Sequence, residues 1–397
     1  MIKRMEYLQK LISFKDKQLI KVVTGIRRCG KSTLLELYRE YLKENDVVEE
    51  QIISVNFEDI KFEELKDYKK MYEYIENKLC KDKITYVFLD EVQNVAEFQK
   101  AVDSLFLKKN IDIYITGSNA YMLSGELATL LSGRYVEIEM LPLSFKEYLE
   151  FSKGELDLKT KLNEYIELGS FPYISELDKN KDAIYDYLRG VYSTVLLKDI
   201  ATRNKINDIM VLESIIKYIF HNVGNICSIK KISDTLTSNG RNISVHTVEA
   251  YIEALKDSYI IYEANRYDIK GKQHLKTLEK YYVVDIGLRN MLLSNKETDV
   301  GHILENIVYL ELIRRGYKVN IGKIADKEVD FIATNQKDTI YYQVAASVLD
   351  PNTLGRELEP LDKIPDHNPK YLITMDELEA SYNGIKKINI INFLLKK

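Results

Sequence analysis

The chain has 397 residues, of which 45% are hydrophobic and 30% are charged, and its formal net charge is -4. A chain of this length exceeds one ordinary domain, so we expect two or three domains with sizeable cores. Because the net charge is slightly negative, the chain as a whole does not attract nucleic acid electrostatically, although a local basic patch is still possible. Cys29, Cys80 and Cys227 lack C-x-x-C spacing, which argues against a zinc site or a disulfide framework and fits a reducing cytosol.

The sequence carries no signal for export or for membrane insertion. Residues 1–10 contain charges throughout and no long apolar run, which is not typical of a secretory signal. No stretch reaches the ~18 consecutive apolar residues of a membrane span. We therefore expect a cytoplasmic protein without membrane contact.

A phosphate-binding loop is predicted after the first strand. Gly25, Gly30, Lys31 and Ser32 fit the pattern G-x-x-x-x-G-K-[ST]. The alternative is a chance turn with a surface lysine, but an apolar run precedes the pattern and a helical pattern follows it, as a phosphate-binding loop requires. Glycine lets backbone N–H groups approach a triphosphate, Lys31 is placed to reach the β- and γ-phosphates, and Ser32 to bind Mg²⁺. The predicted nucleotide-binding residues are Gly25, Ile26, Arg27, Arg28, Cys29, Gly30, Lys31, Ser32 and Thr33.

A second motif has the form of a Walker B element. Residues 84–91 are an apolar strand that ends in Asp90 and Glu91. We expect Asp90 to hold Mg²⁺ through its water shell and Glu91 to polarise the attacking water. The alternative is an acidic strand end that caps a helix beginning at Val92. The order and spacing relative to the phosphate-binding loop favour the Walker B interpretation.

Strands and helices alternate through the first 150 residues. The predicted strands are 19–24, 51–57, 84–91, 111–116 and 135–140. The predicted helices are 7–14, 32–43, 68–80, 98–108 and 123–131. This alternation implies an α/β fold with a doubly wound parallel sheet, whose ligand lies beyond the carboxyl ends of the strands.

Ser118 and Asn119 follow the fourth predicted strand. A polar side chain at that position can orient the water beside the γ-phosphate, which makes both residues candidate sensors. Both residues are equally suited to ending the strand and capping the helix near Tyr121. The sequence leaves these two roles open.

Several segments resemble a prokaryotic family of AAA-superfamily ATPases that has a C-terminal domain of unknown function. The resemblance rests on SGRYVEIEMLPLSFKEYL at 132–149, GSFP at 169–172, residues 196–203 and YYVVDIGLR at 281–289. It implies ATP rather than GTP as the nucleotide, bound with Mg²⁺. It implies four regions: a P-loop ATPase core at 1–150, a helical lid at 151–205, a winged-helix domain at 206–290, and an α/β PD-(D/E)xK nuclease-like domain at 291–397.

Arg134 lies where AAA-type ATPases often carry an arginine finger. The resemblance implies that it neutralises charge on the nucleotide of a neighbouring copy in a homo-oligomer. The alternatives are an ordinary surface arginine or an ion pair with Glu137.

The winged-helix pattern raises the question of DNA binding. Glu249 and Glu253 lie on the third predicted helix, 244–256, and would repel phosphates. A basic cluster lies where a wing hairpin is predicted, around Gly271: Arg266, Lys270, Lys272 and Lys276. Such a wing could contact a DNA backbone without reading bases, whereas a solvated hairpin or a protein-contact module fits the same charges.

The C-terminal region resembles a nuclease-like fold with an incomplete site. Glu305, Asp330 and Gln343 occupy positions of metal ligands, and Ala345 occupies the position of the lysine. A neutral amide is a weak ligand for a hard dication, and alanine contributes no charge. The three residues are therefore a relic metal site or local hydrogen-bonding groups, and cleavage activity is not favoured.

Three functional hypotheses follow. The first is Mg-ATP hydrolysis that drives a conformational switch of the winged-helix and nuclease-like domains. The second is a nucleotide-gated module with negligible turnover that binds DNA or an unidentified protein partner. The third is an ATP-coupled nuclease in DNA defence or repair.

Overall fold

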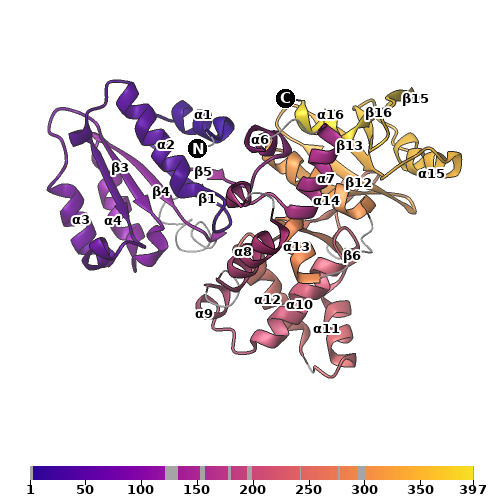
Figure 1. Cartoon of the computed structure of the whole chain (residues 1–397), viewed down its shortest axis with the longest axis horizontal. Coiled ribbons are helices and arrows are strands. Elements are labelled where there is room, and N and C mark those ends of the chain that lie inside the picture. The colour runs from indigo at the N-terminus through magenta and orange to yellow at the C-terminus, as the bar shows by residue number, and fades with distance from the viewer. Residues whose placement is uncertain are drawn as a thin grey trace. The chain divides into compact units, whose positions relative to one another are not determined.

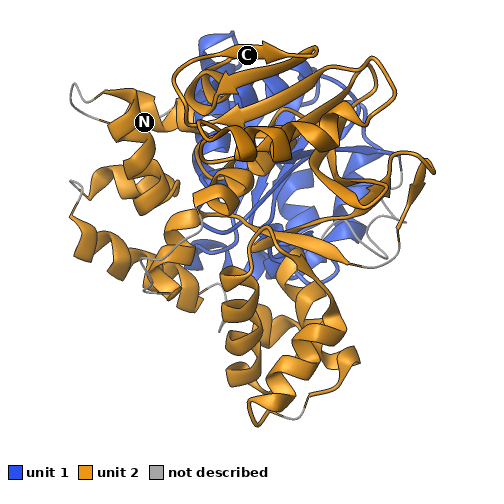
Figure 2. Cartoon of the chain, turned by 90° about the vertical axis from the view of Figure 1, so that its right-hand side faces the viewer, with its two compact units in different colours: residues 1–141, 257–259 blue, residues 142–256, 260–397 orange. Residues whose placement is uncertain are grey.

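The computed structural model describes residues 3–120, 133–152, 157–177, 180–194, 199–241, 243–275, 278–293 and 300–396. The chain divides into two compact units, which Figure 2 colours separately. Unit 1 comprises residues 1–141 with 257–259, and unit 2 comprises residues 142–256 with 260–397. The first unit ends before the boundary predicted at residue 150, and the finer division of the second remains a prediction.

Unit 1 is built on a five-stranded sheet in the order β2-β3-β4-β1-β5, with every neighbouring pair parallel. The strands are β1 (Ile20–Thr24), β2 (Ile52–Asn56), β3 (Thr85–Asp90), β4 (Ile111–Thr116) and β5 (Tyr135–Glu139). β1, β3 and β4 are buried along their whole length, as strands covered on both faces must be. The predicted α/β class and parallel sheet are confirmed.

Helices flank this sheet (Figure 1). They are α1 (Met5–Ser13), α2 (Lys31–Glu44), α3 (Tyr68–Glu76) and α4 (Phe98–Phe106), with short 3₁₀ helices η1 (Glu49–Gln51), η2 (Ile60–Lys66) and η3 (Val92–Asn94). α3 begins where the Asp67 carboxylate accepts hydrogen bonds from the amides of Lys69 and Lys70, both at 3.0 Å. The helix predicted at 123–131 lies outside the described residues.

A buried ion pair lies between the two central strands. Lys21 on β1 and Asp112 on β4 are 0% and 2% exposed, and their side chains are in direct contact. The other Asp112 oxygen accepts hydrogen bonds from the Tyr114 hydroxyl and the Asp16 amide, both at 2.9 Å. Burial raises the pKa of Asp112, although Lys21 opposes the shift. Both oxygens of the Asp112 carboxylate therefore have polar partners within the sheet.

Unit 2 contains two sheets. A three-stranded sheet, order β6-β10-β7, is antiparallel and consists of β6 (Ile226–Cys227), β7 (Ile261–Ala264) and β10 (Glu279–Val283). An eight-stranded sheet has the order β15-β16-β14-β13-β12-β11-β8-β9. Its strands are β8 (Arg266–Asp268), β9 (Gln273–His274), β11 (Lys318–Ile324), β12 (Lys327–Thr334), β13 (Thr339–Val344), β14 (Lys370–Thr374), β15 (Ala380–Tyr382) and β16 (Ile385–Asn389).

The helices of unit 2 precede and flank these sheets. They are α6 (Phe145–Phe151), α7 (Leu158–Leu168), η5 (Pro172–Glu176), α8 (Lys181–Ser193), α9 (Ala201–Arg203), α10 (Ile209–His221), α11 (Ile229–Ser238), α12 (Val245–Asp257), α13 (Ile286–Leu293), α14 (Val300–Arg314), α15 (Pro351–Asp362) and α16 (Ile390–Leu395). None of the helices within the described ranges has both the length and the apolar character needed to cross a bilayer.

The predicted wing segment joins the C-terminal sheet. β8 and β9 pair as an antiparallel hairpin, and β8 also pairs in parallel with β11. Arg266 lies in β8 and is half-buried, whereas Lys270 and Lys272 are exposed. Lys276 lies outside the described residues. The basic cluster is therefore divided between a sheet position and an exposed turn.

The buried ion pair gives a stability prediction. Replacing Asp112 with alanine leaves the ammonium of Lys21 buried without its carboxylate, so we expect a loss of about 3–5 kcal/mol in the free energy of unfolding. Urea titration followed by circular dichroism measures the loss. Glu97→Ala, which removes the exposed ion pair to Lys100, is the control and should cost at most ~1 kcal/mol. Equal losses in the two variants would contradict the conclusion that the buried ion pair contributes more to stability than the exposed one.

Candidate nucleotide-binding site

Three adjacent strands of unit 1 end at one edge of the sheet. β3, β4 and β1 are neighbours and run parallel, so their carboxyl ends lie side by side. The predicted phosphate-binding loop follows β1, Asp90 and Glu91 end β3, and Ser118 follows β4. The fold therefore brings the three predicted motifs together, at the edge where ligands bind in sheets of this type.

The loop after β1 has the shape of an anion cradle. Gly25 has φ of +132°, and a Cβ there would lie 2.1 Å from the carbonyl oxygen of Met140. Gly30 has φ of 102° and immediately precedes α2. α2 thus begins at Lys31, and its free backbone N–H groups lie next to the loop. This geometry fits a bound phosphate, because glycine is needed where the backbone must approach closely.

Lys31 lies inside the loop rather than on the surface. It is 4% exposed, and its ammonium donates hydrogen bonds to the carbonyls of Gly25 at 3.1 Å and Ile26 at 3.3 Å. The same nitrogen lies 3.5 Å from Glu91 Oε1. Phosphate oxygens are acceptors that an ammonium prefers over neutral carbonyls. The residues present therefore fit a polyphosphate.

Asp90 is held by two side chains that sequence reasoning missed. Its carboxylate accepts hydrogen bonds from Thr116 Oγ1 at 2.5 Å and from Asn56 Nδ2 at 3.1 Å. Thr116 Oγ1 also accepts a hydrogen bond from the backbone N–H of Glu91 at 2.9 Å. A hydroxyl on β4 thus fixes both members of the acidic pair. The positions of Asn56 and Thr116 at the ends of β2 and β4 are the feature that could have indicated this role.

Glu91 is buried, and its neighbours favour the ionised form of its carboxylate. Its backbone is left-handed, with φ of 53°, and it is 6% exposed. Burial alone would raise its pKa, but attraction by Lys31 and hydrogen bonds from Gln93 and Ser118 hold the pKa below its ordinary value. A charged carboxylate at a strand end beside the phosphate loop can accept a proton from a water molecule.

Both sensor candidates are buried just beyond the end of β4. The Ser118 hydroxyl donates a hydrogen bond to Glu91 Oε2 at 3.3 Å and is 6% exposed. Asn119 is 7% exposed. The segment in which the sequence predicts the helix that these residues would cap lies outside the described residues. The contact to Glu91 places Ser118 within the acidic site.

The loop is fastened from the N-terminus by a residue that no sequence motif marks. The Arg4 guanidinium donates hydrogen bonds to the carbonyls of Cys29 at 3.0 Å and Leu141 at 2.8 Å. Arg4 is 4% exposed and lies over the ring of Tyr7. Within unit 1, this arginine ties the phosphate-binding loop to the segment after β5.

Arg134 does not pair with Glu137. Its guanidinium contacts the Asp103 carboxylate and lies 5.6 Å from the Phe106 ring centroid, both on α4. Glu137 instead accepts hydrogen bonds from Thr24 at 2.7 Å and Tyr259 at 3.3 Å. The side chain of Arg134 remains partly exposed, and its role as a finger stays a prediction.

The C-terminal candidates Glu305, Asp330 and Gln343 line one cavity of unit 2, together with Ala345. Gln343 is engaged within the protein, because its Oε1 accepts from the Asp330 amide at 3.2 Å and its Nε2 donates to Glu357 at 3.0 Å. Burial raises the pKa of Asp330, and the charge of Glu305 adds to the shift. The sequence did not indicate that Lys280 also enters this cavity.

Comparisons with known proteins agree with this geometry. Residues 17–149 match an AAA domain, and residues 159–299 match a domain of unknown function, DUF8612. The chain is 43% identical over 403 residues to an uncharacterized protein of Haemophilus influenzae, covering 100% of this chain and 99% of that protein. It is 33% identical over 394 residues to an uncharacterized protein of Methanocaldococcus jannaschii, covering 94% and 84%.

A solved structure shares the fold. A Walker-type ATPase of Pyrococcus abyssi resembles the chain with a TM-score of 0.52 and 17% sequence identity, over 74% of this chain and 96% of that one.

Gly25 provides a test of the cradle. In Gly25→Ala, the new methyl group meets the Met140 carbonyl, so the loop must move, and we expect at least a tenfold loss of nucleotide affinity in calorimetry. Gly133→Ala is the matched control for stability: Gly133 also has positive φ, but among the described residues no atom beyond its chain neighbours lies within 4 Å of its Cβ position. The control should lose only about 1 kcal/mol of unfolding free energy. Unchanged nucleotide binding in Gly25→Ala would refute the cradle.

Proposed function

Because this chain belongs to a family of prokaryotic AAA-type ATPases, we propose that it binds Mg-ATP and hydrolyses it to ADP and phosphate. The observation that carries this proposal is the placement of an ionised Glu91 carboxylate 3.5 Å from the Lys31 ammonium, at the edge where the glycine-rich loop ends. A base and a phosphate-binding cation are thereby positioned for the same ligand.

Each residue has a defined task in this proposal. The loop amides and Lys31 bind the β- and γ-phosphates, and the ammonium exchanges its loop carbonyls for phosphate oxygens. Ser32 and Asp90 hold Mg²⁺, which neutralises charge that develops on the phosphates. Thr116 and Asn56 position Asp90. Glu91 accepts the proton of the attacking water, and Ser118 orients the carboxylate that receives it.

The wider roles rest on the same site. We propose that hydrolysis switches the arrangement of the later domains, and that Arg134 acts on the nucleotide of a second copy in an oligomer. For Arg134 to do so, its guanidinium must leave Asp103. Three further points remain predictions: a cytoplasmic location, an unidentified protein partner, and contact between a DNA backbone and Arg266, Lys270, Lys272 and Lys276.

Replacement of Glu91 distinguishes an ATPase from a binding module. Glu91→Gln should lower the steady-state rate of phosphate release at least 100-fold, because the base is lost, while ATP affinity stays within a fewfold of wild type. Lys31→Ala should lose affinity instead. Phosphate release and equilibrium binding of a fluorescent ATP analogue measure the two effects.

Glu76→Gln serves as the control, since Glu76 is an exposed residue of α3 paired with Lys108. It should match wild type in both measurements. Tight ATP binding with equal, background-level release in wild type and Glu91→Gln would support the module instead of the enzyme. Absence of ATP binding by the folded wild type would refute both.

The lowered pKa of Glu91 predicts a pH dependence. Hydrolysis requires the ionised carboxylate, so the rate falls as the pH drops through the pKa of Glu91, and this acid limb should lie below the ordinary glutamate pKa. Ser118→Ala removes a hydrogen bond that favours the charged form, so the acid limb should move to higher pH. Rate profiles between about pH 3 and 8, with folding checked by circular dichroism, measure the shift. An acid limb unmoved by the substitution would exclude this role for Ser118.

A further inference from the structure

The outer edge of the sheet in unit 1 carries a basic pocket that the proposed hydrolysis does not use. β2 is the last strand of this sheet, and no strand within the described residues pairs with its outer side. A pocket of about 220 Å³ lies along residues 52–54 of this strand. Its lining includes four basic side chains and one acidic side chain, namely Arg39, Lys43, Lys61, Lys78 and Glu49.

The pocket lies across the edge of the sheet rather than over one face. α2 packs Tyr38 against Phe88 of β3, whereas α3 belongs to the core cluster that contains Val87 and Leu89 of the same strand. Neighbouring residues of a strand point to opposite faces, so α2 and α3 cover opposite faces of the sheet. Both helices contribute side chains to the pocket. The pocket therefore lies beside the outer backbone of β2.

β2 turns two unpaired backbone groups toward this edge. The Phe57 amide donates to the Asp90 carbonyl at 3.1 Å, so Phe57 faces β3. Because successive residues of a strand direct their backbone groups to opposite sides, Ile52 and Ser54 face outward. The Ile52 amide agrees with this direction, since it donates to the Glu49 carbonyl. Among the described residues, the Ile52 carbonyl and the Ser54 amide have no hydrogen-bond partner.

Three of the four cations in this pocket lack a carboxylate partner. Within the described ranges, neither Arg39 nor Lys61 nor Lys78 forms an ion pair. Lys43 is the paired cation, with Glu40 at 3.3 Å and Glu49 at 2.9 Å. The pocket therefore holds an excess of positive charge.

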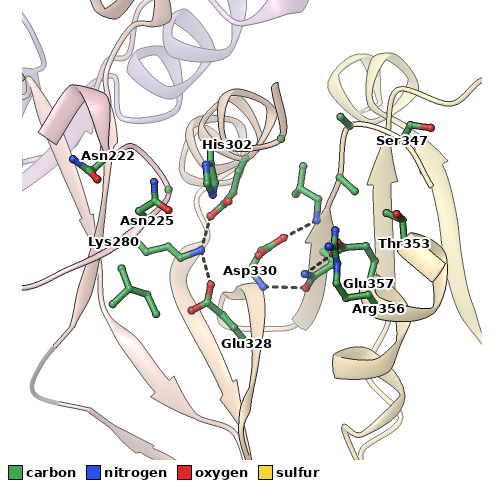
Figure 3. A pocket seen from close by; sticks show the side chains of 18 of the residues that line it. Asn222, Asn225, Lys280, His302, Glu328, Asp330, Ser347, Thr353, Arg356 and Glu357 are labelled. Atoms are coloured by element: carbon green, nitrogen blue, oxygen red, sulfur yellow. Dashed lines mark hydrogen bonds and ion pairs between the residues drawn. The ribbon is translucent and has the colours of Figure 1, made fainter. Parts of the chain in front are cut away.

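These cations differ from the buried lysine of unit 2. Lys280 contacts Glu305 at 2.9 Å and Glu328 at 2.6 Å, and Figure 3 shows it within its acidic cavity. In the basic pocket, by contrast, the buried Nε of Arg39 has no hydrogen-bond partner in the described part of the chain. The Lys78 ammonium donates to a neutral tyrosine hydroxyl at 2.8 Å. The cations of the basic pocket are therefore available to carboxylates from another molecule.

We propose that this pocket binds an extended acidic segment of a partner protein, which adds a strand beside β2. One residue of a parallel incoming strand can donate its amide to the Ile52 carbonyl and accept from the Ser54 amide. Carboxylates of the segment pair with the unpaired cations. A nucleic-acid backbone fits less well, because its phosphates offer no donor to the Ile52 carbonyl. The proposal concerns binding at the sheet edge and does not depend on ATP hydrolysis.

Charge also selects the occupant of this edge. An open strand edge can pair with the same edge of a second copy, and lysines placed along the edge oppose this pairing. Two copies joined through β2 would bring their unpaired cations together. An acidic segment removes this repulsion and supplies the missing backbone partners at the same time. A partner with carboxylates is therefore favoured over a second copy of the chain.

Reversal of charge in the pocket tests the proposal. The probe is a fluorescein-labelled peptide of alternating Glu and Val, and fluorescence anisotropy measures its binding to the full chain without nucleotide. Lys61→Glu combined with Lys78→Glu should weaken binding at least tenfold, because both cations become repulsive. Lys69→Glu combined with Lys70→Glu is the matched control, since these lysines are exposed on α3 and outside the pocket. The control should bind the peptide as wild type does.

Two further probes separate strand addition from attraction by charge alone. A peptide with the same side chains but N-methylated amides cannot donate to the Ile52 carbonyl, so it should bind at least tenfold more weakly. A labelled oligothymidine should bind more weakly than the unmodified peptide. The proposal is overturned if wild type does not bind the unmodified peptide, if the reversed pair binds it as tightly as the control pair, or if the N-methylated peptide binds equally well. Tighter binding of the oligothymidine through Lys61 and Lys78 would also overturn it, because the site would then be one for nucleic acid.

Discussion

The ion pair between Lys31 and Glu91 joins the two motifs on which the nucleotide site depends. The lysine begins the helix after β1 and the glutamate follows β3, so the pair forms only because β4 holds these strands in one parallel sheet. In a buried position, either charge alone would be costly. When a bound phosphate takes the place of the carboxylate at the ammonium, Glu91 keeps its hydrogen bonds from Gln93 and Ser118.

The sheet also determines where the loop can go. The loop leaves β1 at Gly25, directly against the carbonyl of Met140 beyond β5, and Arg4 binds the next carbonyl, that of Leu141, together with the carbonyl of Cys29. The shape of the phosphate-binding loop therefore depends on the segment after β5 as well as on the sequence of the loop itself. A loop constrained on both sides loses little conformational entropy when it orders around phosphate.

The sequence predicted the features that depend on residues close to one another along the chain. The strands, α2 and the glycine spacing follow from local patterns, and the parallel order followed from their alternation. Thr116 and Asn56 could not be assigned to Asp90 because the contact requires knowing which strands are adjacent. For the same reason, the sequence could not identify the ion-pair partner of Arg134: Glu137 was one alternative considered, but α4 brings Asp103 to Arg134 from 31 positions away. In unit 2, Ala345 marked a missing lysine, but no local pattern linked Lys280 to Asp330.

Two of the buried lysines, Lys31 and Lys280, differ in how readily they release their partners. Lys31 contacts one carboxylate at 3.5 Å and two neutral carbonyls. An incoming polyphosphate offers it more charge than it gives up, so an anion is the ligand that replaces its partners. Lys280 contacts two carboxylates at 2.9 and 2.6 Å, and a third acid lies on the same strand face. No single phosphate improves on that arrangement, so the Lys280 ammonium stays with the carboxylates of its own unit. The same residue type thus offers its charge to a ligand in one unit and keeps it within the protein in the other, because the number of surrounding carboxylates differs.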